Sequence, residues 1–160
     1  MAYVLSTPTK RTTVARTQAF YLAGSLLLMF ILITSVGAVA GNFFQADFEM
    51  SKFIALNIGC FLLLFAVSGI SFFSSCYFNL SRNSFAIGAG LPLAFFIFRI
   101  MTEISNDLDF FRYISLNTLF NTNAIITGGD YILNLMILAV IAVILYIAGI
   151  WVFKEKDLPL

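Results

Sequence analysis

The stretch that decides the fold is the uncharged run YILNLMILAVIAVILYIAGIWVF, residues 131–153, which is followed directly by the charged tail KEKDLPL, residues 154–160. A helix needs about 20 mostly apolar residues to cross a membrane, and this run has 23. A soluble protein rarely ends on such a run without a linker. The sequence therefore predicts a final membrane span that stops at the cytoplasmic surface.

The composition places the whole chain in the membrane class. Of its 160 residues, 61% are hydrophobic and 11% are charged, whereas soluble domains carry about a quarter charged residues. The net charge of +1 predicts no nucleic-acid partner. Cys60 and Cys76 lie in one apolar run, where they are expected to act as small hydrophobes.

Enzyme chemistry is not expected from this composition. The chain contains no histidine, which excludes histidine-based acid–base catalysis and most zinc sites. It also lacks the Gly-rich loop ending in Lys-Ser or Lys-Thr that binds nucleoside triphosphates. We therefore predict no catalytic residues, no metal and no cofactor. An intramembrane enzyme is disfavoured because the runs lack paired carboxylates.

Three further uncharged runs precede the last one. They cover residues 17–41, 53–81 and 83–98, and the third reaches full length if Arg99 lies near the far interface. We therefore predict an all-α integral membrane protein, a single domain over residues 1–160, with spans at about 17–41, 54–78, 83–103 and 131–153. Residues 103–130 mix acidic, polar and aromatic side chains, which indicates an outer interfacial or re-entrant helical segment.

The distribution of basic residues predicts the orientation. Four spans place both ends of the chain on one side of the membrane. Basic residues accumulate in the cytoplasm, so we expect a multi-pass protein of the cell membrane with both termini cytoplasmic. Lys52 and Arg112 then lie outside. The basic residues on the side of the termini are Lys10, Arg11, Arg16, Arg82, Lys154 and Lys156.

Two features within the spans concern helix packing. Gly37 and Gly41 form a Gly-x-x-x-Gly pair. Such spacing lets two helix backbones approach closely, although it also arises by chance in a span rich in Gly and Ala. Pro92 lies in the third span and is expected to kink it.

Polar side chains in the second span are the candidates for a pathway or an interface. Ser68, Ser71 and Ser75 are spaced by three and four residues, so they share one helical face, and Asn57 lies earlier in the same span. They either hydrogen-bond within and between helices or form a polar strip along a substrate route.

Arg99 is the one charge within an apolar stretch. At mid-membrane it would cost about 3 kcal/mol. Glu103 lies four residues later, so the two side chains can pair on one helical face. Arg99 is expected either to extend to the outer interface or to face a pathway.

Four segments resemble the permease subunits of bacterial ABC exporters of the second type. They are VLSTPTKR (residues 4–11), SFFSSCYFNLSRNSFAIGAG (71–90), the outer segment 113–130 and the closing FKEKDLPL (153–160). The resemblance implies export driven by ATP hydrolysis in a separate ATP-binding cassette subunit, with a second permease subunit as a homo- or heterodimeric partner. Apolar walls with scattered Ser and Asn suit an amphipathic peptide, drug or lipid as cargo.

The resemblance also suggests where the ATP-binding subunit docks. The candidate contacts with this subunit are basic residues or lie next to the first span. The alternative is that their positive charge only anchors the span on the cytoplasmic side. Family members usually have six spans, so this chain is expected to be a truncated or split permease lacking the first two. The competing interpretation is a small four-helix structural or regulatory membrane protein without transport. The candidate contacts are Pro8, Lys10, Arg11, Arg16 and, more weakly, Arg82.

Overall fold

The computed structural model describes residues 11–44, 49–104, 116–127, 129 and 131–155, and in these ranges it contains helices but no strand. Four of the helices are long and apolar enough to cross a membrane. The predicted class, an all-α membrane protein with four spans, is therefore confirmed. The helices are α2 (Arg11–Phe44), α3 (Met50–Tyr77), α4 (Ser81–Ile104), the 3-10 helix η2 (Leu116–Leu119), α6 (Thr122–Thr127) and α7 (Ile132–Glu155).

The long helices differ in length from the predicted spans. α2 begins at Arg11, six residues before the predicted start at residue 17, and α3 begins at Met50 instead of residue 54. An α-helix satisfies its own backbone hydrogen bonds and rises 1.5 Å per residue, so it can continue past the roughly 30 Å hydrocarbon layer. Arg16, which directly precedes the predicted span, consequently lies inside α2.

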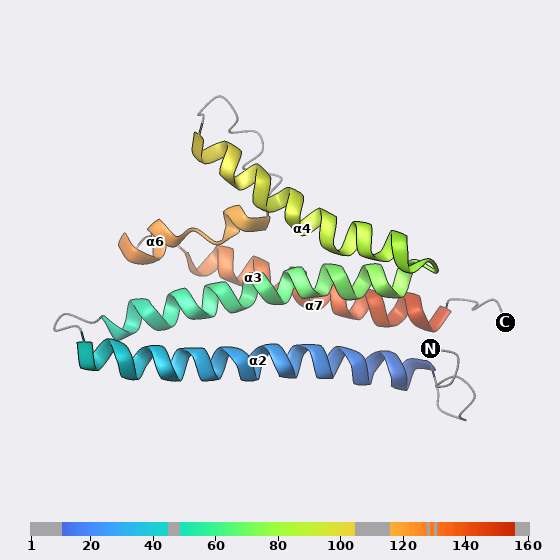
Figure 1. Cartoon of the computed structure of the whole chain (residues 1–160), viewed down its shortest axis with the longest axis horizontal. Helices are drawn as coiled ribbons and strands as arrows, with labels where there is room; N and C mark the ends of the chain where they lie inside the picture. The colour runs from blue at the N-terminus through green and yellow to red at the C-terminus, as the bar shows by residue number, and fades with distance from the viewer. Residues whose placement is uncertain (1–10, 45–48, 105–115, 128, 130, 156–160) are drawn as a thin grey trace.

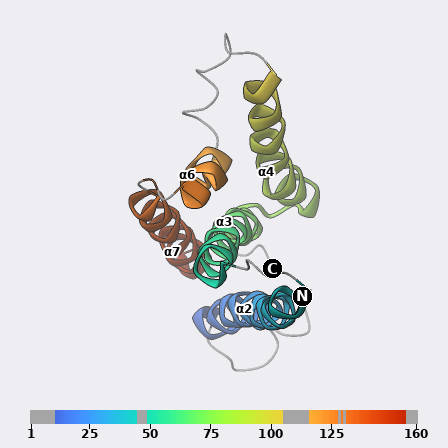
Figure 2. The same ribbon diagram turned by 90° about the vertical axis from the view of Figure 1, so that its left-hand side faces the viewer.

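α3 is the central helix of the bundle. Figure 2 shows α2, α4 and α7 arranged around it. α3 and α7 run in the same direction, whereas α2 and α4 run in the opposite one (Figure 1). The start of α2, the end of α7 and the turn between α3 and α4 therefore lie at the same end of the molecule. We refer to it below as the termini end.

The most extensive helix–helix contact joins α3 and α7. Small residues line it: a Cβ added to Gly69 would lie 3.1 Å from the Cβ of Leu145, and one added to Gly149 would lie 2.9 Å from the Phe72 ring. Ala142 is fully buried between the two helices. Small side chains allow close approach, and the resulting van der Waals contact is what holds helices together in lipid.

The segment before α7 folds back onto the bundle. Phe120 packs so closely on α3 that a Cβ at Gly59 would lie 2.5 Å from its ring. Leu116 and Leu119 pack against the cluster that contains Leu138. Figure 1 shows η2 and α6 on the side of α3 and α7 that faces the diverging half of α4. The described part of the predicted outer segment is therefore helical and packed on the spans.

Candidate functional site

The contact between α3 and α4 centres on a carbonyl that Pro92 leaves without its helical donor. In an α-helix the N–H of residue 92 would bond to the carbonyl of residue 88, but proline has no N–H. Ser71 of α3 donates its hydroxyl to this Gly88 oxygen, at 2.8 Å. A Cβ at Gly88 would lie 3.3 Å from the Cα of Ser71. The absence of that Cβ therefore helps α3 come near enough to replace the missing donor.

A second serine joins the same two helices. Ser74 is 1% exposed, and its hydroxyl donates to the carbonyl of Ser84, at 2.8 Å. The sequence reading did not single out Ser74, although its spacing of three from Ser71 was an available signal. Ser71 and Ser74 thus fasten the first half of α4 to α3 through backbone carbonyls.

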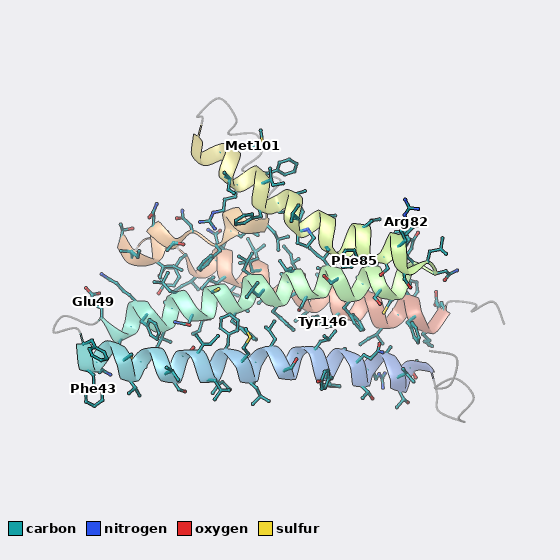
Figure 3. The ribbon with its side chains drawn as sticks, viewed as in Figure 1. Phe43, Glu49, Arg82, Phe85, Met101 and Tyr146 are labelled. Atoms are coloured by element: carbon teal, nitrogen blue, oxygen red, sulfur yellow. The ribbon has the colours of Figure 1, made fainter. Side chains whose placement is uncertain are left out.

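Ser68, one turn before Ser71, connects α3 to α7. Its hydroxyl donates to the carbonyl of Phe65, at 2.8 Å, and its oxygen lies 2.8 Å from the hydroxyl of Tyr146. Tyr146 is 7% exposed, and its ring stacks on Phe65 and Phe72 with centroids 4.9 and 5.2 Å away. Figure 3 shows Tyr146 beside the middle of the bundle.

Tyr146 was missed by the sequence reading. It is the one hydroxyl-bearing residue among residues 132–153, and a buried tyrosine usually finds a hydrogen-bond partner. That rule predicts that the Tyr146 hydroxyl bonds to a polar side chain of another span, but it does not identify which one.

We expect Tyr146→Phe to lower the free energy of unfolding by about 0.6 kcal/mol, the average for one hydrogen bond between membrane helices. The ring stacking is preserved, and Ser68 keeps its bond to the carbonyl of Phe65. Unfolding by titrating a denaturing detergent, followed by circular dichroism, measures the effect. A loss above about 2 kcal/mol would contradict this limited role of the hydroxyl.

The three predicted serines also border a groove of about 610 Å³ between α2 and α3. α2 contributes polar side chains to it, so the serine face also meets α2, in addition to its bonds to α4 and α7. The residues that line the groove are Thr17, Gln18, Tyr21, Leu22, Ser68, Ser71, Phe72 and Ser75.

Asn57 is separate from the serines. Its side-chain amide donates to the carbonyl of Phe53, four residues earlier, at 2.9 Å. It borders a smaller hollow of about 290 Å³ between α2 and α3, whose lining includes Phe30 and Phe61. The rings of these two residues meet edge to face with centroids 5.5 Å apart. The predicted polar residues of α3 thus border two separate hollows along the contact between α2 and α3.

Gly37, the first residue of the Gly-x-x-x-Gly pair, lies at the same contact between α2 and α3. A Cβ at Gly37 would lie 2.6 Å from the ring of Phe53, so Gly37 accepts an aromatic side chain of α3. Gly41 lies one turn later in α2 and is half-buried.

The predicted charged positions lie at the two ends of the helices. Arg16 of α2 and Arg82 of α4 are exposed, and Arg82 points outward at the termini end (Figure 3). Arg99 is half-buried in α4, and its carbonyl accepts the hydroxyl of Thr102 at 2.8 Å. At the opposite end Lys52 pairs with Glu49, at 2.7 Å.

The structure leaves several predicted contacts undescribed. Pro8 and Lys10 lie outside the described residues, as does Lys156. Arg11 starts α2 and Glu103 lies in the last turn of α4, but their side chains are not described, so the predicted pair of Arg99 and Glu103 also falls outside. Among the described residues no three His, Cys, Asp or Glu side chains gather as metal ligands.

Comparison with known proteins gives no relative. No family model matches the chain, and no curated protein or solved structure shows significant similarity to it.

Proposed function

We propose that the chain is the membrane-spanning permease subunit of an ATP-driven ABC exporter. Its four-segment resemblance to these permeases supports the proposal. ATP hydrolysis would occur in a separate ATP-binding cassette subunit, and a second permease subunit would complete the transporter. The substrate class that suits the apolar walls and scattered hydroxyls is an amphipathic molecule.

The observation that carries the proposal is the way α2 is attached. This helix runs unbroken for 34 residues from Arg11, about 51 Å at 1.5 Å per residue. Within it, only Ala15, Ala19 and Phe30 are buried among the described side chains. A long helix with few anchoring points can tilt as a rigid body. Its basic start at the termini end is where a partner subunit would push.

We expect Lys10→Glu combined with Arg11→Glu to reduce recovery of the ATP-binding subunit at least fivefold when the two proteins are co-purified. Acidic side chains would replace the basic ones in the proposed contact. The partner is sought among ATP-binding cassette proteins encoded beside this chain, and recovery is measured as co-purified ATPase activity per mole of permease.

Lys52→Glu is the matched control, since Lys52 is a solvent-accessible lysine at the opposite end of the helices. It should leave recovery unchanged. Protease accessibility of both ends must be the same in all variants, because added negative charge near a span can alter its orientation. Equal recovery with the wild-type and the double variant would contradict the proposed contact.

A structural protein without transport is the second candidate, and the hydroxyl bonding favours it. Ser68, Ser71 and Ser74 donate to carbonyls of α3 or α4. Such bonds stabilise a bundle and provide no polar route through it. A chain that is stable alone and fails to retain any ATP-binding subunit would support this candidate.

A further inference from the structure

The groove between α2 and α3 lies towards the termini end. Gln18 is seven residues from the start of α2, and Ser75 is two residues from the end of α3. Leu22 and Ser68 border the groove farther along the helices. The groove therefore extends from near the helix ends, where lipid head groups lie, towards the apolar middle of the bundle.

Three polar side chains in this groove lack a hydrogen-bond partner in the described part of the chain. Gln18, Tyr21 and Ser75 line the groove and are exposed, and none of them makes a hydrogen bond to another described residue. At this end of the groove such side chains can bond to water or to a lipid head group. A head group that bonds to both helices would satisfy them together.

The remaining polar groups decide which occupant fits. The hydroxyls of Thr17, Ser68 and Ser71 already donate, to the carbonyls of Thr13, Phe65 and Gly88. A hydroxyl oxygen has two lone pairs, so these side chains still present acceptor sites. The Gln18 amide and the hydroxyls of Tyr21 and Ser75 add donors that no other described residue uses, so the groove offers both donors and acceptors, and a head group whose hydroxyls donate and accept suits it.

The groove is also unsuited to a charged lipid head group. No Asp, Glu, Lys or Arg side chain is among the described residues that line it. An ammonium or phosphate head would lose water there without gaining a counter-ion. Leu22 and Phe72 supply apolar contact for an acyl chain, and about 610 Å³ lies within the usual range for a small-molecule site.

We infer that this groove binds one molecule of an uncharged lipid whose head carries free hydroxyls, of the acylglycerol class. The hydroxyls donate to Ser71, Ser75 and the side-chain carbonyl of Gln18, and the acyl chain follows Leu22 and Phe72. The site depends on these residues alone and holds whether or not the chain takes part in export.

The test uses the full chain in phosphatidylcholine nanodiscs. The probe is a monoacylglycerol that carries a photoreactive diazirine near its head, with labelled peptides identified by mass spectrometry. We expect labelling of α2 around Gln18 and of α3 around Ser75, and at least fivefold less in Gln18→Leu/Ser75→Ala. Both residues are exposed, so this variant should fold, which circular dichroism checks.

Ser25→Ala/Ser35→Ala is the matched control, because it removes two exposed hydroxyls of α2 outside the groove. It should keep the labelling. Unlabelled dioleoylglycerol should compete, and dioleoylphosphatidylglycerol should not. Three results would overturn the inference: labelling spread evenly over the lipid-facing helices, equal competition by the anionic lipid, or unchanged labelling in the groove variant.

Discussion

Replacing Gly69 by leucine is expected to lower the free energy of unfolding by about 3 kcal/mol, the upper part of the range for overpacking a tight contact. A Cβ at this position would already lie 3.1 Å from the Cβ of Leu145 and 3.4 Å from the carbonyl oxygen of Ala142. Neither atom lies at the end of a flexible side chain that could move aside. The added leucine would therefore push α3 away from α7.

The separation would also disturb the polar contact beside it. Ser68 precedes Gly69 directly, and its bond to Tyr146 crosses the same interface. Titration with a denaturing detergent, followed by circular dichroism, gives the free energy. Native gel migration reports any expansion of the bundle.

Gly24→Leu is the matched control for this substitution. No heavy atom lies within 4 Å of a Cβ at Gly24 among the described residues, so the added side chain meets open space beside α2. Leucine favours helix over glycine by nearly 1 kcal/mol, so this variant should be as stable as the wild type or slightly more stable. Equal losses at both positions, or no loss at Gly69, would mean that the α3–α7 contact does not hold the bundle.

The four long apolar helices could be predicted from the sequence, but not the contact that holds them together. Charges such as Lys52 and Arg82 border the uncharged runs, and hydrocarbon thickness sets the length of a run that can span. The Gly37 and Gly41 pair was recognised because it is local. The central contact instead pairs Gly69 with Ala142, residues far apart in the chain, and single small residues are too common in membrane helices to indicate which face is packed.

For the polar residues too, the sequence predicts local features but not partners that lie far along the chain. The shared face of Ser68, Ser71 and Ser75 followed from the helical period alone. The partner of each hydroxyl did not, because the acceptors lie in other helices or in the backbone. Pro92 predicted that the carbonyl of Gly88 would lack its donor, yet only the position of α3 in space makes Ser71 the replacement.

Ser71→Ala is expected to lower the free energy of unfolding by about 1.5 kcal/mol, because it leaves the buried Gly88 carbonyl without a donor. The same substitution in a Pro92→Ala background should cost only a few tenths of a kcal/mol. Alanine at position 92 restores the N–H that bonds to the carbonyl of Gly88, so the hydroxyl of Ser71 is no longer needed. Detergent titration of the four proteins of this double-mutant cycle gives a coupling of about 1 kcal/mol.

Ser75→Ala is the control for this cycle. Ser75 lies on the same face of α3, is exposed, and makes no hydrogen bond to another described residue, so its replacement should have the same small effect in the wild type and in the Pro92→Ala background. If the effects of Ser71→Ala and Pro92→Ala instead add to within about 0.3 kcal/mol, Ser71 does not replace the missing donor. A coupling confined to Ser71 would mean that the proline in α4 is tolerated because α3 lies against it, so that any bending of α4 at Pro92 must first break the bond to Ser71.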